Sequence, residues 1–342
     1  MNVLHVFDVS AMVYAGNYTG TEWFGYPVGG IQYVLNRIAL AVASYDWMVP
    51  CFDSPSFRNE IYSKYKSGRE KHPEVYSQIE TLYEGLQHCG IKCEKYDRYE
   101  ADDLIEWAVA ENFEKFVRGV EIVGNDRDLC HSIRNNVVFR TTNSTMTDVD
   151  QNNFSTAIKK GIKVPYNTVS AYKVFCGCSS DAIPAMKLKK GVSGYTLYQL
   201  WCKACGGPAN LRQRIIGANP ETVRVFCQKI GIFTEEELKD VDKRIELIYP
   251  AEKPEDVTLE PTKCSEVDKD ALAKFMNLYG AKTAVRCIGK RVESLTDNDK
   301  MLLKNKAQVL KTGAYAADKN LESRAKSVRS KCVDLDAFTR GF

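Results

Sequence analysis

The sequence Val3-Leu-His-Val-Phe-Asp8 is a short apolar run that ends at an aspartate. Two later runs have the same form, residues 47–52 before Asp53 and residues 121–125 before Asp126. Such runs predict buried strands, and the strands of a parallel sheet bring their carboxyl ends to one edge, where α/β folds bind ligands. We therefore predict an α/β fold in which three aspartates meet at that edge.

A fourth acidic cluster, Glu100-Ala-Asp102-Asp103, opens a predicted helix, and Asp128 follows Asp126 by two residues. So many carboxylates at one edge would repel one another severely unless divalent cations lay among them. An aspartate after a strand is also a common helix cap or turn former, which explains any single one of them more simply. Repetition at three strand ends favours a metal site for the group.

Length and composition exclude several classes of protein. The 342 residues, 44% of them hydrophobic, can bury a substantial core and suggest two structural units. No apolar run approaches the roughly 20 residues of a membrane helix, and the N-terminus lacks the basic region of a signal peptide. We therefore predict a soluble, cytoplasmic protein. Its 12 cysteines favour reduced core thiols, although Cys176, Cys178, Cys202 and Cys205 leave a four-thiolate zinc site open.

Two basic segments indicate nucleic acid as a partner, although the net charge is only +3. Residues 57–72 combine cations with tyrosines, a mixture that can hold phosphates and stack bases. These residues are Arg58, Tyr62, Lys64, Tyr65, Lys66, Arg69 and Lys71. A solvated helix face would show a similar charge run. The second segment contains Lys187, Lys189 and Lys190 and leads into Gly191-Val-Ser-Gly194, where glycines let backbone amides approach a phosphate.

Five blocks of sequence occur in an order and at separations that match a known family. They are Val6-Phe-Asp8-x-Ser10; Phe52-Asp53 with Phe57-Arg58-x-Glu60 and Tyr65-Lys66-Ser-Gly-Arg69; Tyr99-Glu100-Ala-Asp102-Asp103; Gly124-Asn-Asp126-Arg-Asp128-Leu129; and Gly177-x-Ser-Ser-Asp181-x-Ile-Pro184. Together they closely resemble the structure-specific 5' nuclease superfamily of flap endonucleases, phage 5'-to-3' exonucleases and the 5'-nuclease domains of bacterial repair polymerases. The resemblance covers about residues 1–290, and the stand-alone, bacteriophage type is the nearest match.

The resemblance implies a PIN-like (Rossmann-like) fold and divalent-metal-dependent hydrolysis of phosphodiesters. Two Mg²⁺ ions, with Mn²⁺ as substitute, would be held by carboxylates. The implied ligands are Asp8, Asp53, Glu100 and Asp102 at the first ion, with Asp103 in its outer shell, and Asp126, Asp128 and Asp181 at the second. Lys66 and Arg69 match cations that clamp the scissile phosphate, so that Asp53, Lys66 and Arg69 are the predicted catalytic residues.

The implied activity is a 5'-to-3' exonuclease or flap endonuclease acting during replication. Its substrates would be branched, nicked or gapped duplex DNA with a 5' single-stranded end, and RNA primers in RNA–DNA hybrids. The predicted DNA contacts are Arg58, Lys64, Tyr65, Lys66, Arg69, Lys189, Lys190, Gly191, Ser193 and Gly194. We expect a monomer. The alternative is a catalytically weak branched-DNA binding protein of the same fold, which would be expected to lose the first-cluster carboxylates that are kept here.

Two departures from the family pattern affect the predicted ions. Cys178 stands where the pattern has a carboxylate ligand, and a thiol is a poor ligand for Mg²⁺, which predicts a weaker second site. Ser193 stands where a glycine is expected in the helix-turn-helix element that grips duplex DNA, and Gly194-Tyr195 replaces Pro-Lys. These changes put in question the K⁺ ion that the family often holds there.

Three segments follow from this comparison. We predict a metal-binding nuclease core over residues 1–163, which includes a helical arch at about 64–98, and a helical, duplex-binding helix-turn-helix region over 164–300. Residues 301–342 carry nine Lys or Arg against four acids and predict a basic, partly disordered tail that contacts phosphates. A docking peptide for a replication partner at its end is a further option. Within the arch, a helical stripe that includes Leu82 and Leu86 is more simply core packing than a base-stacking surface.

Overall fold

A computed structural model describes residues 3–312 except 117, 134–135, 142–144, 147–154, 160–161, 166–167, 189–190 and 206–218. The chain forms two compact units that are interleaved in sequence. The first contains residues 1–11, 45–70 and 92–263, and the second contains residues 12–44, 71–91 and 264–342. Neither unit follows the segment boundary predicted at residue 163, so that functional division stays a prediction.

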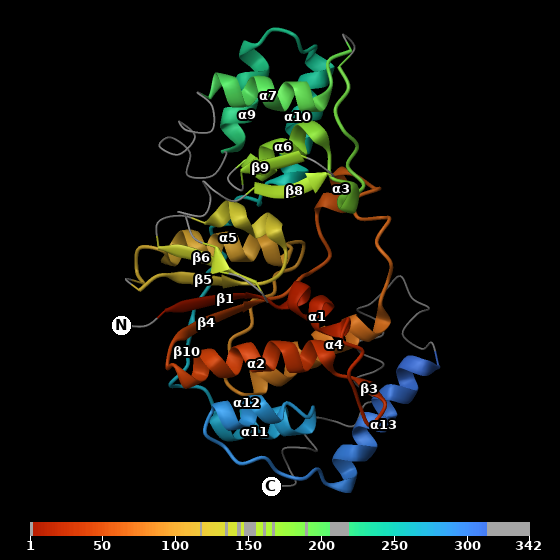
Figure 1. The fold of residues 1–342 in the computed structure, drawn as a ribbon, viewed down its shortest axis with the longest axis vertical. Coiled ribbons are helices and arrows are strands. Elements are labelled where there is room, and N and C mark those ends of the chain that lie inside the picture. Colours follow the sequence, from red (N-terminus) through yellow and green to blue (C-terminus); the bar gives the residue numbers. More distant parts are fainter. Residues whose placement is uncertain are drawn as a thin grey trace. The chain divides into compact units, whose positions relative to one another are not determined.

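The first unit is built on a six-stranded sheet in the order β10-β4-β1-β5-β6-β7 (Figure 1). Its strands are β1 (Leu4–Asp8), β4 (Trp47–Cys51), β5 (Val120–Val123), β6 (Val137–Arg140), β7 (Thr145–Met146) and β10 (Thr262–Lys263). The central strands β4, β1, β5 and β6 are parallel, and the two short edge strands are antiparallel. The predicted α/β class with a mostly parallel sheet is therefore confirmed.

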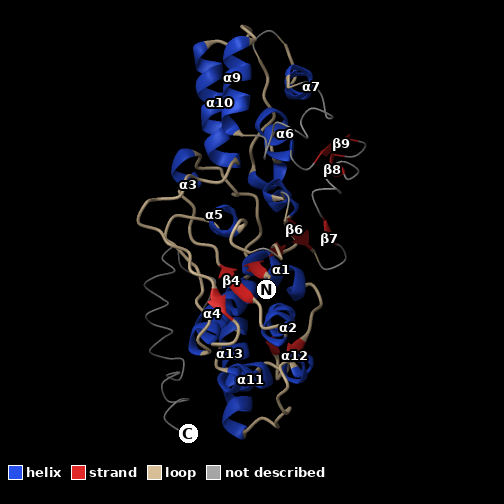
Figure 2. Cartoon of the chain, turned by 90° about the vertical axis from the view of Figure 1, so that its left-hand side faces the viewer, coloured by secondary structure: helices blue, strands red, loops and turns tan. Residues whose placement is uncertain are grey.

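Helices of the first unit cover this sheet and extend from it. They are α3 (Arg58–Ile61), α5 (Ala101–Asn112), α6 (Val169–Cys176), α7 (Gly194–Ala204), α9 (Pro220–Lys229) and α10 (Glu235–Ile248), with two 3-10 turns, η1 (Arg127–Ser132) and η4 (Ser179–Asp181). One continuous apolar core joins the strands and α5 to α6, α7, α9 and α10. Helices α9 and α10 run side by side (Figure 2). A separate hairpin consists of β8 (Ser155–Lys159) and β9 (Ile162–Pro165).

The second unit is mainly helical. It contains α2 (Gly29–Ala43), α4 (Pro73–His88), α11 (Lys269–Leu278), α12 (Lys282–Cys287) and α13 (Asp297–Lys311), with the hairpin β2 (Glu22–Trp23) and β3 (Tyr26–Pro27). Helix α1 (Val9–Asn17) begins in the first unit and ends in the second. No helix in the described ranges is long and apolar enough to span a membrane.

Helix α4 occupies the middle of the predicted arch but is packed in the core of the second unit. Leu82 and Leu86 are fully buried. The side-chain oxygen of Gln78 accepts hydrogen bonds from the backbone amides of Gly30 (2.9 Å) and Ile31 (3.2 Å). The interpretation as core packing is confirmed for Leu82 and Leu86, whereas Tyr76 on the same predicted stripe is exposed. The parts of the arch segment that belong to the first unit are the turn-rich stretch 64–70 and residues 92–98.

The predicted tail begins later than residue 301. Residues 301–311 belong to α13, which starts at a capping box between Thr296 and Asp299 and buries Leu303 and Ala307, one helical turn apart. These local signals override the basic composition of the segment. The rest of the tail, residues 313–342, lies outside the described residues, as does the docking peptide predicted there.

A half-buried histidine connects two strands of the sheet. His5 of β1 lies beside Glu121 of β5, with 2.7 Å between Nδ1 and Oε2, and its Nε2 lies 3.1 Å from Asp46 Oδ2. Burial alone would lower the pKa of His5, but the hydrogen bonds to Glu121 and Asp46 outweigh it and raise this pKa above 6.5. Bonds from His5 and Arg140 outweigh burial at Glu121 and lower the pKa of that carboxyl.

We expect His5 to make stability depend on pH. A raised pKa contributes stability that is complete below about pH 6.5 and is lost as the pH rises through the pKa of the folded state. Asn in place of His5 is therefore expected to cost about 1–2 kcal/mol near pH 5.5 and less above pH 8. Urea unfolding at both pH values measures the difference, with the exposed His88→Asn as control. A cost that does not change with pH would contradict the assignment.

Candidate active site

The three strand-end aspartates meet at the carboxyl edge of the sheet. Asp8 ends β1, Asp53 follows β4 and Asp126 follows β5, and these strands are neighbours in the order β4-β1-β5. Each carboxylate accepts one backbone hydrogen bond, from Ala11 at 2.9 Å, Ala101 at 2.8 Å and Asp128 at 2.9 Å, respectively. The cap interpretation is confirmed for Asp8 and Asp126, whose bonds are local, whereas the bond to Asp53 comes from a residue 48 positions away. A single backbone bond orients each side chain without neutralising its charge, so the metal-site interpretation stays a prediction.

Asp102, in the first turn of α5, completes what we call the four-aspartate cluster: Asp8, Asp53, Asp102 and Asp126. Burial, then the charges of Asp53 and Asp126, raise the pKa of Asp8 to about 8. Burial, followed by the charges of Asp126 and Asp8, raises the pKa of Asp102 well above its ordinary value. The pKa of Asp126 is also raised, by burial and by Asp128. Asp126, predicted for the second ion, is thus electrostatically part of the first group.

Positive charge compensates the cluster only weakly. Lys66 acts to lower the pKa of Asp8, Asp102 and Asp126, but burial and the neighbouring carboxylates outweigh it. In the part of the chain that the structure describes, none of its four carboxylates lies within ion-pair distance of a Lys or Arg. Nor do any three His, Cys, Asp or Glu side chains of the described residues converge closely enough to hold a metal ion in these rotamers. Mutual repulsion keeps ionised carboxylates apart, and a divalent cation removes it. An all-carboxylate donor set suits Mg²⁺ or Mn²⁺, so the residues fit the implied ion.

Glu100 and Asp103, unlike the four-aspartate cluster, pair directly with cations. Asp103 is fully buried and receives Arg58 through both carboxylate oxygens, at 2.9 and 2.8 Å. It also accepts from the backbone amides of Glu100 (3.1 Å) and Ala251 (2.8 Å). The oxygens of Asp103 thus form a capping box and a buried ion pair, and Glu100 pairs with Arg58 and Lys66. The predicted roles of Glu100 as a ligand of the first ion and of Asp103 in its outer shell stay predictions.

Arg58 and Tyr65 are likewise internal. Arg58 is 3% exposed and also donates to Glu100 Oε2 at 3.1 Å and to the Tyr249 carbonyl at 2.9 Å. Tyr65 is 6% exposed and its hydroxyl donates to Glu100 Oε2 at 2.9 Å. These bonds correct the expectation that both side chains contact DNA, since neither presents a polar group to solvent.

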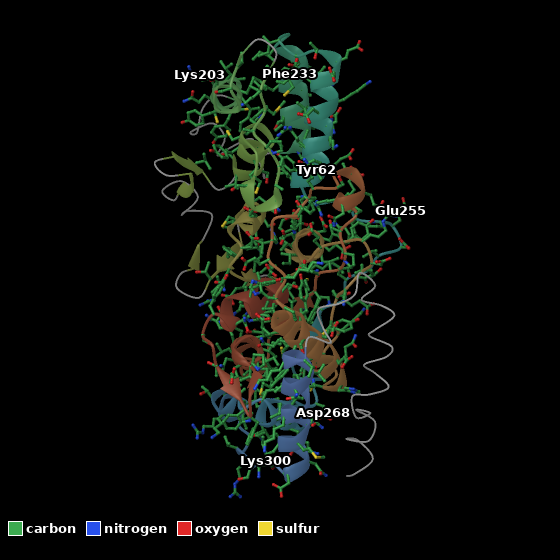
Figure 3. The ribbon with its side chains drawn as sticks, turned by 90° about the vertical axis from the view of Figure 1, so that its right-hand side faces the viewer. Tyr62, Lys203, Phe233, Glu255, Asp268 and Lys300 are labelled. Atoms are coloured by element: carbon green, nitrogen blue, oxygen red, sulfur yellow. The ribbon has the colours of Figure 1, made fainter. Side chains whose placement is uncertain are left out.

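Two other cations of the basic segment, Lys66 and Arg69, line the site. Lys64 is exposed, Lys66 pairs with Glu100, and Arg69 Nη2 lies 2.8 Å from Asp181 Oδ1. The backbone of Lys66 is left-handed, with φ of +53°, and its amide donates to the Asp181 carbonyl at 3.1 Å. Nearby, the Lys243 ammonium lies 5.3 Å from the ring centroid of Tyr62, the residue labelled beside the end of α10 in Figure 3.

One pocket brings these groups together. Its lining includes Lys66, Arg69, Asp102, Asp126, Lys173 and Asp181. Carboxylates and cationic side chains therefore line one concave site, which can bind a phosphate group beside a divalent cation. Lys173, on α6, was not predicted from the sequence, and its ammonium pairs with Asp128. The available signal was its place on the helix that leads directly into the Gly177 block.

The structure describes only part of the segment that was predicted to bind duplex DNA. Gly191 has φ of +76° and open space around it, and Ser193 caps α7 by accepting from the Thr196 amide at 3.2 Å. Gly194 is buried, and an added Cβ would lie 1.9 Å from the Phe175 carbonyl oxygen, so packing requires this glycine. Lys189 and Lys190 lie outside the described residues. The DNA contacts predicted here stay predictions.

A site of this kind, with carboxylates at a sheet edge and cations across a pocket, defines a class of phosphodiester-hydrolysing proteins. Residues 3–159 match the family model of the 5'-3' exonuclease N-terminal resolvase-like domain. The 5'-3' exonuclease of Mycoplasma genitalium is 31% identical over 215 residues, which cover 59% of this chain and 72% of that protein. The chain therefore belongs to the 5'-3' exonuclease family, and the predicted superfamily and nuclease class are confirmed.

The chain is also similar to two further proteins. The 5'-3' exonuclease of Mycoplasma pneumoniae is 29% identical over 250 residues, covering 70% of this chain and 79% of that protein. A solved structure of the T5 D15 protein co-crystallised with metal ions covers 90% of this chain and all of that chain, with a TM-score of 0.49 and 12% identity.

Proposed function

We propose that this protein hydrolyses phosphodiester bonds near the free 5' end of nicked, gapped or flapped duplex DNA, and of RNA primers annealed to DNA, with Mg²⁺ as the preferred ion and Mn²⁺ as substitute. The proposal rests on one observation. The carboxylates of the four-aspartate cluster have no direct ion pair among the described residues, and they lie at a pocket that Lys66 and Arg69 also line. We further propose that it acts as a monomer in the cytoplasm during replication.

The chain's own residues have distinct roles in this proposal. Asp8, Asp53, Asp102 and Asp126 would hold the divalent cation, which when bound supplies Lewis-acid polarisation of the phosphate and a more acidic water. Lys66 and Arg69 bind the phosphate oxygens and stabilise the negative charge that develops on them. Glu100 positions Lys66, and Arg58 with Tyr65 in turn holds Glu100. The turn from Gly191 to Gly194, with or without K⁺, would contact the duplex backbone.

Lys66→Ala is expected to lower kcat for cleavage about 10²-fold with little change in DNA affinity, because one donor to the developing charge is lost while other phosphate contacts remain. Single-turnover cleavage together with binding assays in Ca²⁺ separates these two quantities. Lys92→Ala, an exposed lysine that pairs with Glu260 at 3.0 Å and is not among the predicted DNA contacts, is the control and should retain cleavage within about twofold. Equal losses in the two variants would mean that Lys66 contributes only general charge.

The substrate class is tested with a panel of labelled DNAs that share one duplex. The panel contains a 5' flap, a nick, a gap, a 3' flap and a 5' flap whose end is blocked by a bulky group. The proposal expects products from the 5' flap, nick and gap, and none from the 3' flap. Cleavage of the blocked 5' flap shows whether the single strand must thread through the protein by its 5' end. Equal cleavage of 5' and 3' flaps would refute 5' specificity, and binding without cleavage would favour the branched-DNA binding alternative.

A further inference from the structure

Two of the residues expected to hold a second metal ion, Asp128 and Asp181, line the pocket, and Cys178 lies behind them, 2.9 Å from Asp181. These three residues are here called the second group: Asp128, Cys178 and Asp181. Asp128 lies in η1, and Cys178 and Asp181 bound η4. Unlike the four-aspartate cluster, each carboxylate of the second group already has a cationic partner from the protein. Lys173 pairs with Asp128, and Arg69 pairs with Asp181.

The position of Lys173 beside Asp128 is fixed by burial and by the packing of α6. Its side chain is 12% exposed, although that of its partner Asp128 is 36% exposed. A long cationic side chain loses its hydration when it is buried in this way and remains there only when the pairing is favourable. Helix α6 fixes its direction, since the neighbouring residues Tyr172 and Val174 belong to the apolar core. The ammonium is therefore held against Asp128 by the fold.

Asp181 has both oxygens engaged. Arg69 Nη2 donates to Oδ1 at 2.8 Å, and the thiol of Cys178 donates to Oδ2 at 2.9 Å. Arg69 Nε also donates to the Ser180 carbonyl at 3.3 Å, and the Lys66 amide donates to the Asp181 carbonyl at 3.1 Å. Sulfur is in any case a poor ligand for Mg²⁺. Asp181 thus anchors the loop that carries Lys66 and Arg69.

The charges of the two groups differ accordingly. Two cations, Lys173 and Arg69, balance the two carboxylates of the second group. A second Mg²⁺ would add two positive charges beside two cations that are already in place, with one carboxylate fewer than the family pattern supplies. In the four-aspartate cluster, by contrast, negative charge is in excess. The donor set of the second group therefore does not fit a second tightly bound divalent ion.

We propose that this nuclease binds one divalent ion tightly, at the four-aspartate cluster, and that Lys173 supplies the positive charge at the second position. The inference rests on the proposed metal-dependent nuclease function. A lysine contributes charge and hydrogen-bond donors to a phosphate oxygen but does not activate water. Any activation of water by a metal would therefore depend on the ion held by the four-aspartate cluster. Cys178 and Asp181 position Arg69.

Counting bound Mn²⁺ on the folded full chain tests this without any cleavage assay. Electron paramagnetic resonance of free Mn²⁺ during a titration should show a single tight ion in the wild type. Lys173→Met removes the charge at similar length, and Cys178→Asp restores a carboxylate. Each variant is expected to bind a second ion on the order of tenfold or more tighter than the wild type does. Lys92→Met, an exposed lysine that pairs with Glu260 at 3.0 Å, is the control and should not change the count.

The outcomes separate this inference from the proposed function. Two equally tight ions in the wild type would overturn the inference, even if cleavage were efficient. A count that stays at one in both folded variants would also overturn it. A single ion in the wild type and a second in either variant would support it, even if no tested DNA were cleaved, in which case only the proposed function would fail. Thermal unfolding verifies that each variant is folded, and if one variant is not, the other decides.

Discussion

Replacing Asp102 by Asn is expected to lower Mg²⁺-dependent cleavage by about 10³-fold or more. The carboxylate lies in the four-aspartate cluster, and several kcal/mol of transition-state stabilisation depend on the ion held there, at about 1.4 kcal/mol for each factor of ten. Single-turnover cleavage of a 5'-labelled flap measures the loss. Asp97→Asn, an exposed aspartate on the preceding loop, is the matched control and should cleave normally. Retained cleavage in the Asp102 variant would remove this residue from the metal site.

The same replacement is expected to stabilise the protein in EDTA. Because the pKa of Asp102 is raised in the folded state, the folded protein holds a proton there that the unfolded chain loses, and stability falls as the pH rises above about 4. Asp8 acts in the same direction up to its pKa of about 8. Asn imitates the protonated carboxyl, so at pH 7.5 the free energy of unfolding should rise. A catalytic loss combined with lower stability would instead indicate a damaged fold.

Replacing Arg58 by Met is expected to cost about 3–5 kcal/mol of stability, which is a large share of what a domain possesses. Asp103, with no exposed surface, would lose its charged partner, and Glu100 and the Tyr249 carbonyl would each lose a donor. Urea unfolding at pH 7 measures the change.

The matched control for Arg58 is another arginine from the same region. Arg98 pairs with Glu60 at 2.8 Å, but both side chains are mostly exposed, and such pairs contribute about 0–1 kcal/mol. Arg98→Met should therefore change stability by less than about 1 kcal/mol. Similar costs for the two variants would contradict the contrast between a buried structural ion pair and a surface pair.

The strand-end aspartates were predictable because their signal is local. A short apolar run followed by Asp specifies both a buried strand and the edge at which its carboxylate lies, and the parallel order of β4, β1 and β5 then brings Asp8, Asp53 and Asp126 together. The same logic placed Asp102 at the start of α5. Asp103 could have been recognised as structural, since Glu100 and Asp103 stand three residues apart at a helix start, the spacing of a capping box.

The roles of Arg58 and Lys173 were not predictable from local sequence. Arg58 lies in a basic run that suggests a surface, but its partners Glu100, Asp103 and Tyr249 lie 42, 45 and 191 residues away. Lys173 is a single cation in an otherwise apolar helix, and only the fold brings it to Asp128, 45 residues earlier. Long-range pairing of charges depends on tertiary contacts that no periodicity records.

The most direct test of the central claim is cleavage of one 5'-labelled flap substrate by the purified protein in Mg²⁺ and in EDTA. The four-aspartate cluster predicts short labelled products in Mg²⁺, none in EDTA and none from Asp53→Asn, whose carboxylate belongs to the cluster but is exposed and carries little of the fold. Tight binding of the flap without cleavage in either Mg²⁺ or Mn²⁺ would contradict the claim and identify a branched-DNA binding protein.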